Sequence, residues 1–293
     1  MNIERFIEAR KASGLSQNEL SDGICTQATL SRFENNSQVP SLKILMKLCN
    51  RLNVPLGELF PKVGVKHSEI IEKMNQAEFY LITSEYELAA ALLDAIAVNE
   101  QAAEPLLARR FHYLKGFVMI AQQAPVIDIL FMFDQILVEE ETNESEIFNL
   151  LAFTGIGMTY ARENDLEKAE FYFQKVLERI YQYPAKSTED TWRVLNIVFQ
   201  SGVFFSRLGE LEIGNALLQH AVIICSDNHV TYYLARAAIQ LAENAIIQKE
   251  PKANILERIY DARAYSKINR NTIALEKLAR MEEEVLAMED VHE

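Results

Sequence analysis

The stretch from Thr26 to Asn35, TQATLSRFEN, carries side chains suited to hydrogen bonding with base-pair edges. The amide of Gln27 can bond bidentately to adenine, and the guanidinium of Arg32 to guanine. Ser and Thr hydroxyls suit phosphate oxygens, whereas an Ala can touch only a thymine methyl group. A helix with a purely structural role would rather carry Glu and Lys here. The candidate contacts to double-stranded DNA are Gln17, Gln27, Ala28, Thr29, Ser31 and Arg32, with Arg10 and Lys43 supplying positive charge for phosphates.

Short helices joined by tight turns must present this stretch. A first helix is expected to end near Ser13-Gly14. Ser16, with Glu19 three residues later, has the spacing of a capping box and predicts the start of a second helix. Asp22-Gly23 closes that helix. Gln17 stands in its first turn, where N–H groups and the amide side chain can face a backbone phosphate.

The third helix is expected from Gln27 to about Asn35 with Thr26 as its cap, and Ser41 is expected to cap a fourth helix through Leu52. The segment NVPLGELF predicts a last short turn. A helix-turn-helix needs a buried side between its helices and a polar side that faces outward. The predicted buried residues are Leu20, Ile24, Leu30 and Phe33, with Ser21 at the crowded helix crossing.

Charge is distributed unevenly along the 293 residues. The net charge is −13, but residues 1–61 hold seven Lys and Arg against six Asp and Glu, a net of +1. The remainder holds 22 basic and 36 acidic residues, a net of −14. The overall acidity therefore says little about what the first sixty residues bind.

Several classes of protein are disfavoured by composition. No apolar run approaches the roughly 20 residues of a membrane span, and the segment MNIERFIEAR lacks the order of a signal peptide. We therefore expect a cytoplasmic protein. Cys25, Cys49 and Cys225 lie far apart and only five His are present, so neither disulfides, metal sites nor cofactors are expected. We also expect no enzyme, because phosphate-binding, nucleophile-elbow and HExxH motifs are missing.

A repeat pattern occupies the rest of the chain. Residues 151–180 follow the tetratricopeptide order of bulky, small and aromatic positions, with END as the turn between two helices. Gly157 and Ala169 are the small residues that let the two helices approach closely. The matching positions are Phe153, Ile156, Gly157, Tyr160, Ala169, Phe173 and Val176.

Other segments fit the same pattern to different degrees. The fit is good around the turns RLGEL and ITSEYE, and poor around Gly116 and Met132, where Asp128 replaces a small residue. Equivalent positions recur about every 40 residues, against roughly 34 in the standard repeat. The segment 242–261 fits only as a helix pair. We predict about five helix pairs and a terminal helix from Asn271 to Met288 that caps the stack.

Residues 1–60 resemble the Xre/Cro-type helix-turn-helix family. The motifs that carry the resemblance are Leu15-Ser16-Gln17, Glu19-Leu20, Ser31-Arg32-Phe33-Glu34, Pro40-Ser41-Leu42 and Glu58-Leu59-Phe60. Joined to a degenerate tetratricopeptide array, the whole chain is similar to the peptide-pheromone quorum-sensing regulators of Gram-positive bacteria, the PlcR/PrgX/Rgg group. This resemblance implies a homodimeric transcription factor that binds an operator and a short secreted peptide taken back into the cell.

The resemblance also implies roles for individual residues by motif position. Bases would be read by Gln17, Gln27, Ala28 and Arg32, with Thr29 and Ser31 near phosphate. Ala28 departs from several relatives of that group, which carry a polar reader at its position. Because an Ala can touch only a thymine methyl group, the operator sequence cannot be carried over from those relatives.

The first helix of each pair would line the concave face of a tetratricopeptide superhelix. Asn amides on that face can pair with the backbone of an extended peptide, and Arg can meet its carboxylate. Trp192 precedes Asn196 at the expected mouth of the groove. The candidate peptide-binding residues are Arg110, Tyr113, Phe117, Thr154, Met158, Asn196, Phe199, Val203, Arg207, Arg236 and Glu243.

The predicted fold class is all-α, a five-helix helix-turn-helix domain followed by a degenerate tetratricopeptide right-handed superhelix. The expected domains are 1–61 for DNA, 62–70 as linker and start of the first repeat helix, 71–270 for about five helix pairs, and 271–293 as capping helix. One alternative is a repressor whose repeats bind a protein partner, an antirepressor or scaffold, instead of a peptide. Another is a repeat scaffold whose first domain has lost DNA binding.

Overall fold

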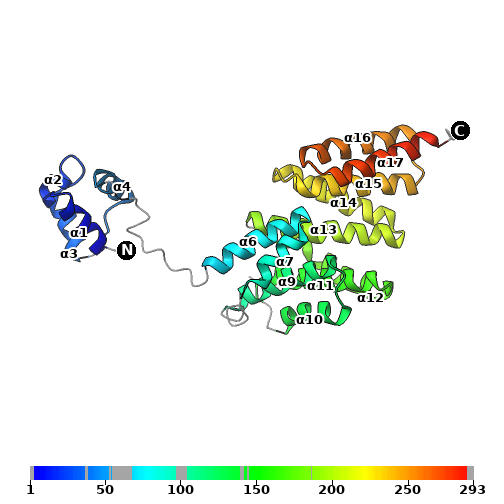
Figure 1. Cartoon of the computed structure of the whole chain (residues 1–293), viewed down its shortest axis with the longest axis horizontal. Coiled ribbons are helices and arrows are strands. Elements are labelled where there is room, and N and C mark those ends of the chain that lie inside the picture. Colours follow the sequence, from blue (N-terminus) through cyan, green and yellow to red (C-terminus); the bar gives the residue numbers. More distant parts are fainter. Residues whose placement is uncertain are drawn as a thin grey trace. The chain divides into compact units, whose positions relative to one another are not determined.

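The structure is a computed structural model that describes residues 3–36, 39–52, 54, 68–96, 104–138, 142–143, 145–185 and 187–288. Every regular element in these ranges is an α-helix, which confirms the all-α fold class (Figure 1). None of the helices in these ranges is long and apolar enough to cross a bilayer. The chain divides into two compact units, Met1–Glu69 and Ile70–Glu293.

The first unit holds four described helices around a small apolar core. They are α1 (Ile3–Ala12), α2 (Gln17–Ser21), α3 (Gln27–Asn36) and α4 (Leu42–Arg51). Leu20, Leu30 and Phe33 are completely buried as predicted, while Ile24 packs partly exposed against them. The ring of Phe6 meets that of Phe33 edge-on, with centroids 5.0 Å apart. The predicted turn NVPLGELF lies outside the described residues except for its second residue.

The helix starts follow the predicted caps in two of three cases. Ser16 and Glu19 form a complete capping box, with Ser16 Oγ accepting from the Glu19 N–H at 3.2 Å and Glu19 Oε2 accepting from the Ser16 N–H at 2.7 Å. Thr26 Oγ1 accepts from the Thr29 N–H at 3.2 Å and opens α3. Ser41 occupies the N-cap position of α4, but its side chain makes no capping hydrogen bond, which corrects that prediction.

The second unit is a stack of helix pairs (Figure 1). A terminal helix, α17 (Thr272–Ala287), follows the pairs and begins at Asn271, whose side chain accepts from the Ala274 N–H at 3.0 Å. The ten paired helices are α6 (Ser68–Thr83) with α7 (Tyr86–Asp94), α9 (Pro105–Ala121) with α10 (Val126–Leu137), α11 (Glu146–Arg162) with α12 (Leu166–Ile180), α13 (Thr188–Leu208) with α14 (Leu211–Asp227), and α15 (Tyr232–Ile247) with α16 (Lys252–Ile268).

Small residues set the close approach within the best repeats. A Cβ atom on Gly157 would lie 2.9 Å from the ring of Phe173, and one on Gly202 would lie 2.8 Å from Leu218. Both contacts join the first helix of a pair to the second, as the repeat spacing predicts. In the poorly fitting repeat the sequence register was wrong by one residue: Phe133, and not Met132, is completely buried on α10, as are Ile129 and Ile136. Its ring fills the space over both Gly116 and Gly155.

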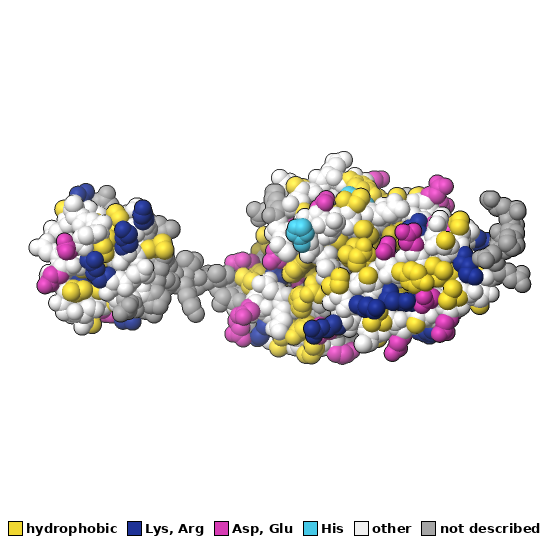
Figure 2. All heavy atoms as spheres, turned by 90° about the horizontal axis from the view of Figure 1, so that it is seen from above, with side chains coloured by type: hydrophobic (Ala, Val, Ile, Leu, Met, Phe, Trp, Pro, Cys, Tyr) yellow, Lys and Arg dark blue, Asp and Glu magenta, His cyan; other side chains and the backbone are white. Residues whose placement is uncertain are grey.

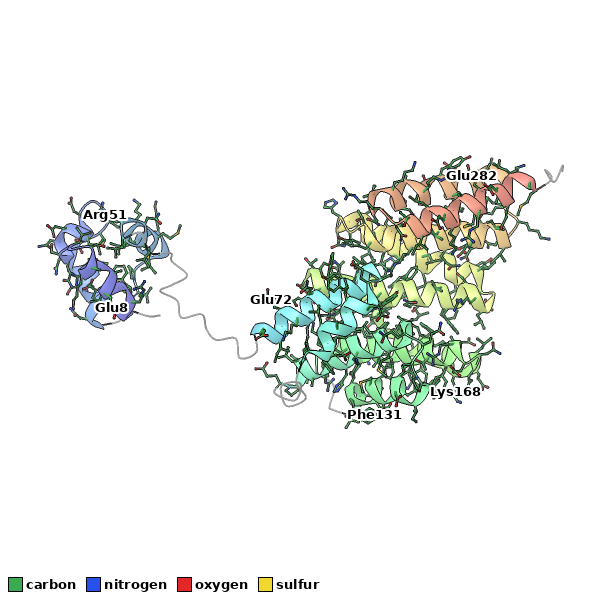
Figure 3. The ribbon with its side chains drawn as sticks, in the orientation of Figure 1. Glu8, Arg51, Glu72, Phe131, Lys168 and Glu282 are labelled. Atoms are coloured by element: carbon green, nitrogen blue, oxygen red, sulfur yellow. The ribbon has the colours of Figure 1, made fainter. Side chains whose placement is uncertain are left out.

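The outer surface of the second unit is formed partly by the second helices of the pairs. Phe131 on α10 and Lys168 on α12 lie at this outer edge (Figure 3). Apolar side chains and interspersed basic ones gather on the face of the unit shown in Figure 2. The first helices of successive pairs pack on one another, α9 on α11, α11 on α13 and α13 on α15. These first helices carry the residues predicted to form the groove.

Helix α6 contacts pairs that lie far away in the sequence. Arg193 on α13 bonds Glu78 on α6 with Nε–Oε1 and Nη2–Oε2 distances of 2.8 and 3.0 Å. The ring of Phe79 meets that of Tyr232, at the start of α15, edge-on with centroids 5.6 Å apart. The first pair is therefore held against the fourth and fifth pairs, which encloses the inner side of the stack.

Candidate functional site

Helix α3 presents its predicted polar residues at the surface of the first unit. Gln27, Ala28 and Arg32 are exposed, and Thr29 and Ser31 are half-buried. The hydroxyls of the last two already have partners on α3 or at its start. Thr29 Oγ1 lies 2.8 Å from Thr26 Oγ1, and Ser31 Oγ accepts from Asn35 Nδ2 at 3.1 Å. Lys43 is exposed on α4.

A chain of hydrogen bonds fixes the amide of Gln27. Its Nε2 donates to Gln17 Oε1 at 2.7 Å, and Gln17 Nε2 donates to Glu34 Oε2 at 2.7 Å. Arg10 completes the chain by donating Nε and Nη2 to the two oxygens of Glu34, at 2.6 and 2.8 Å. The side chain of Glu34 is 3% exposed. The Gln27 side chain is thereby connected through Gln17 to the buried carboxylate of Glu34.

Two members of the predicted DNA-binding set already have hydrogen-bond partners within the first unit. Arg10 was expected to neutralise phosphate, but its guanidinium is occupied by Glu34 and, through Nη1, by the Leu15 carbonyl at 2.9 Å. Gln17 was expected to aim its side chain at phosphate, but both its amide atoms bond within the unit. Both residues belong to the chain of hydrogen bonds that joins Gln27 to the buried carboxylate of Glu34. Arg10 falls short as a phosphate ligand because its charge already faces a buried carboxylate.

Four of the predicted peptide-binding residues lie in the core of the second unit. Arg110 Nε donates to Glu78 Oε2 at 3.0 Å, and the Tyr113 hydroxyl donates to Glu78 Oε1. Phe117 is buried edge-on against Phe133, with centroids 5.7 Å apart. Thr154 is completely buried and donates Oγ1 to the Leu150 carbonyl at 2.8 Å. The prediction placed these residues on an open concave face, and the packing of α6 and α10 corrects it.

Glu78 is the only acidic side chain among the buried partners of Arg110 and Tyr113 in the described residues. Burial acts to raise the pKa of the Glu78 carboxyl, but the charges of Arg110 and Arg193 and the hydrogen bonds from Arg193 and Tyr113 outweigh it. The pKa therefore lies below its ordinary value of 4.5. Glu78 stays ionised and ties α6 to α9 and α13.

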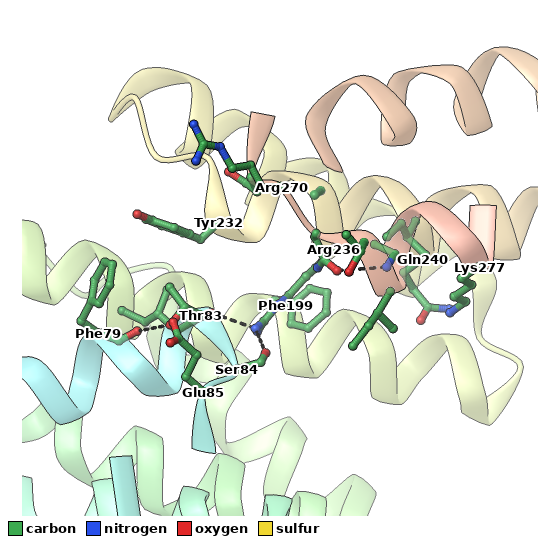
Figure 4. Close-up of a pocket in the computed structure, with 18 of the residues that line it drawn as sticks. Phe79, Thr83, Ser84, Glu85, Phe199, Tyr232, Arg236, Gln240, Arg270 and Lys277 are labelled. Atoms are coloured by element: carbon green, nitrogen blue, oxygen red, sulfur yellow. Dashed lines mark hydrogen bonds between the residues drawn. The ribbon is translucent and has the colours of Figure 1, made fainter. Parts of the chain in front are cut away.

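The large cleft, of about 740 Å³, lies between the first pair and the last helices (Figure 4). Three predicted residues line it: Phe199 of α13, and Arg236 and Glu243 of α15. Its other walls come from both ends of the unit and were not predicted. They include Phe79, Ile82, Ser84 and Glu85 from the first pair, Tyr232, Ile239 and Gln240 from α15, and Asn271, Ile273 and Lys277 from the last turn and α17.

The small cleft, of about 360 Å³, lies between the C-terminal halves of α9, α11 and α13. The predicted residues Met158, Val203 and Arg207 line it together with Ile120 and Phe204. A third cavity of about 10 Å³ is bordered by Trp192 and Asn196 beside Glu78, so it is too small for a peptide side chain. One face of α13 therefore borders these three cavities. Its residues there are Asn196, Phe199, Val203 and Arg207, which we call the α13 stripe.

Within the described residues, no group of three or more His, Cys, Asp and Glu side chains is arranged to hold a metal ion. The chemistry that the two units offer is recognition by hydrogen bonds, charge and apolar contact. The first unit offers Gln27 and Arg32 on an exposed helix. The second offers clefts with apolar walls and guanidinium groups at their edges.

Comparison with known families assigns the first unit. The family described as Helix-turn-helix matches residues 6–59, a range that contains α2 to α4 and all of α1 after its first three residues. Residues 6–59 are a helix-turn-helix domain. Within it, α2 and α3 are the two helices that name the motif, and α3 takes the position of the recognition helix.

Solved structures share the fold of the whole chain. PlcR of Bacillus thuringiensis, in complex with the peptide PapR7 and DNA, matches with a TM-score of 0.59 and 14% identity over 98% of this chain and 99% of that one. ComR of S. thermophilus, in complex with DNA and its signalling peptide ComS, matches with a TM-score of 0.55 and 15% identity over 97% and 99%. These likenesses confirm the predicted all-helical architecture, a helix-turn-helix unit followed by helix pairs.

One curated relative is the transcriptional activator NprA of Geobacillus stearothermophilus. It is 25% identical over 226 residues, which cover 75% of this chain and 51% of that protein. The chain therefore spans about half the length of this relative. This relative is named as a transcriptional activator, and the match is one of sequence, separate from the similarity of fold.

Proposed function

We propose that this protein is a cytoplasmic transcriptional regulator that binds operator DNA through α3 and senses a short peptide in the clefts of its helical second unit. The observation that carries the proposal is the exposed Gln27 and Arg32 on the recognition helix of a helix-turn-helix domain, with Gln27 held in place by Gln17. Structures of the same fold were solved with both DNA and a peptide, which supports the pairing of these two ligands.

The large cleft has the size and lining for several residues of an extended peptide. Its volume of about 740 Å³ lies within the range of ligand pockets, about 300–1,000 Å³. Phe79, Phe199 and Ile239 offer apolar contact, while Gln240 and Asn271 can pair with backbone groups of the peptide. The small cleft, with Met158 and Val203, offers a further apolar subsite on the same stripe of α13.

The mechanism that we propose is a population shift in a homodimer. A peptide that binds one arrangement of the helix pairs more tightly than another moves the equilibrium toward the first. Helix-turn-helix dimers contact half-sites about one helical turn apart, so a change in the spacing of two α3 helices alters operator affinity. The name of NprA favours activation, and we propose the same direction for this chain.

The DNA claim is tested by removing the two base-reading side chains. We expect the double substitution Gln27→Ala with Arg32→Ala to weaken binding to duplexes selected by the wild-type chain by about 10² to 10⁴, because each bidentate contact contributes about 1–3 kcal/mol. The measurement is a mobility shift assay at fixed salt. The matched control, Gln200→Ala with Arg207→Ala, removes the same side-chain types from the small cleft. Equal affinities for both double variants would refute the assignment of α3.

A protein partner remains the second candidate, favoured by apolar side chains on the outer surface. Ile127 and Phe131 on α10 are 74% and 56% exposed, and Phe171 on α12 is 53% exposed. Such residues can form the centre of a protein interface. Binding of a protein to the second unit that is lost in Phe131→Ala and kept in Phe199→Ala would favour this candidate over the peptide.

A further inference from the structure

Arg236 crosses the large cleft from α15 to the C-terminal end of α6. Its Nη2 donates to the Ile82 carbonyl at 2.8 Å and to the Ser84 hydroxyl (Figure 4). The guanidinium also lies over the ring of Tyr233, with its Cζ atom 5.3 Å from the ring centroid. These contacts join the first helix pair to the fifth.

The bond to Ile82 satisfies a group that α6 cannot satisfy by itself. Helix α6 ends at Thr83, so the Ile82 carbonyl is one of its last four, which lack partners within the helix. A guanidinium at this position also interacts favourably with the negative end of the helix dipole. Arg236 is therefore a cap for the C-terminal end of α6 that comes from a distant helix, since its two hydrogen bonds span 154 and 152 residues of the sequence.

The charge of Arg236 has no carboxylate partner within the described residues. The other charges of the cleft are arranged differently. Lys277 pairs with Glu243 at 2.7 Å, and Glu85 Oε1 accepts from Thr83 Oγ1 at 2.7 Å. Arg270 also lines the cleft, but it is exposed and stands just after α16. Arg236 is half-buried and bonds only neutral oxygens. A guanidinium forms shorter bonds to a carboxylate, roughly twice as strong as those to neutral acceptors, and often two at once.

We propose that the guanidinium of Arg236 exchanges its hydrogen bonds to the end of α6 for hydrogen bonds to a ligand. The carboxylate of an apolar ligand in the large cleft takes the guanidinium from Ile82 and Ser84, and the C-terminal end of α6 is released from the fifth pair. The ligand class is an apolar chain with a free carboxylate, such as the C-terminal end of a peptide. This inference rests on the proposed function. It adds that the carboxylate of the ligand is recognised and that its binding breaks the hydrogen bonds from Arg236 to Ile82 and Ser84.

The exchange acts on the first helix pair and leaves the core of the second unit in place. Glu78, one turn before Ile82, stays bonded to Arg193 and Arg110 in the interior. Only the end of α6 and the turn to α7 lose a partner. In that turn, the Glu85 N–H bonds the Tyr80 carbonyl at 2.8 Å and the Ser84 N–H bonds the Leu81 carbonyl at 3.3 Å. These two amides report the release.

Hydrogen exchange of the full chain tests the contact itself. We expect Arg236→Gln to raise the exchange rate of amides in residues 80–86 about tenfold, the factor that one hydrogen bond from a charged donor contributes. Arg236→Lys keeps the charge without the planar fork and should give an intermediate rate. Arg207→Gln, which removes a guanidinium from the small cleft, is the matched control. Wild-type rates in Arg236→Gln would overturn the proposal.

Three probes test the exchange with a carboxylate. They are N-acetyl-Leu-Phe as the free acid, its C-terminal amide, and octanoate. We expect the free acid, and not the amide, to raise the exchange of residues 80–86 in the wild type, with no further rise in Arg236→Gln. An equal effect of octanoate would show that any apolar carboxylate suffices, whereas its inactivity would assign the site to peptides.

Two results would overturn the exchange: no effect of the free acid on the wild type, or equal effects of acid and amide. Failure of the proposed function is seen separately. The wild-type chain could bind no duplex in the mobility shift assay while the free acid still releases α6. In that case the proposed function as a DNA-binding regulator is wrong, and the inference about Arg236 is retained.

Discussion

At the scale of single residues, the proposed function of the first unit depends on the side chains that α3 exposes, Gln27 above all. Residue types and spacing in the sequence were enough to select Gln27 and Arg32 as exposed readers. They were not enough to separate these residues from Arg10, because its partner Glu34 lies 24 positions away on another helix. A basic residue in a sequence carries no sign of the buried carboxylate that neutralises it.

Removing Arg10 should therefore affect stability more than charge. Arg10→Ala leaves the buried carboxylate of Glu34 without its ion partner, which costs about 3–5 kcal/mol. We expect faster hydrogen exchange throughout α1 and α3 in the full chain, together with weaker DNA binding. Lys11→Ala, an exposed neighbour on α1, is the control and should leave exchange unchanged. Identical exchange in the two variants would show that the pair has no structural role.

Glu78 predicts a pH dependence for the second unit. Its folded-state pKa lies below the ordinary value of 4.5, so the folded state binds fewer protons than the unfolded state at low pH. The stability that it contributes is present above about pH 4.5 and is lost as the pH falls through the lower, folded pKa. We expect the thermal midpoint of the wild type to fall more steeply below pH 4.5 than that of Glu78→Gln.

That comparison has a second arm at neutral pH. Glu78→Gln removes the carboxylate that Arg110 and Arg193 share in the interior and, among the described residues, leaves Arg193 only its bond to Asp190 Oδ1 at 3.3 Å. Its midpoint at pH 7 should therefore be lower than that of the wild type. Parallel midpoint curves for the two proteins between pH 3 and pH 5 would contradict the assignment of a lowered pKa to Glu78.

At the scale of helices, the small-residue spacing identified the pairs and missed some of their registers. Gly157 and Ala169 were recognised because both fall in one contiguous repeat. Phe133 was missed because the two glycines that its ring covers, Gly116 and Gly155, belong to different pairs. The inner face of α9 was misassigned for a related reason. Helix α6 covers Arg110 and Tyr113 through Glu78, a contact between residues more than 30 positions apart.

The packing over Gly155 gives a test in which helix propensity and packing oppose each other. Ala is a better helix former than Gly by about 1 kcal/mol, but overpacking a core costs about 1–3 kcal/mol. Because a Cβ on Gly155 would meet the Phe133 ring, we expect Gly155→Ala to lower the thermal midpoint. Adding Phe133→Leu should restore part of it. A higher midpoint in Gly155→Ala alone would mean that the ring moves aside freely.

At the scale of the whole molecule, the sequence indicated two parts with different charge but not the location of the clefts. The large cleft joins Phe79 to Lys277, residues from the first and last helices of the second unit. Repeat spacing describes contacts between neighbouring pairs and holds no information on contacts between the first pair and the fifth. Phe199, Arg236 and Glu243 were predicted because they stand at inward positions of the first helices of their pairs, α13 and α15.

Trp192 reports on ligand binding at this scale. It lines the smallest cavity beside Glu78 and Arg193, next to the α13 stripe that borders both clefts. We expect short apolar peptides from the host's culture medium to change its fluorescence, because they alter the contacts of α6 and α13. Phe199→Ala should weaken the change and Phe131→Ala should not. A response to a protein-sized partner alone would favour the second candidate function.

The central claim is that a peptide in the second unit changes the affinity of the first unit for DNA. The most direct measurement is the fluorescence anisotropy of a selected duplex titrated with the full chain at fixed salt, with and without the peptide fraction that alters Trp192 fluorescence. An effector that is coupled to a second site typically changes the affinity of that site by about 5- to 150-fold. We predict that the peptide changes the affinity for the duplex by at least about fivefold. An unchanged duplex affinity at saturating peptide would contradict the account.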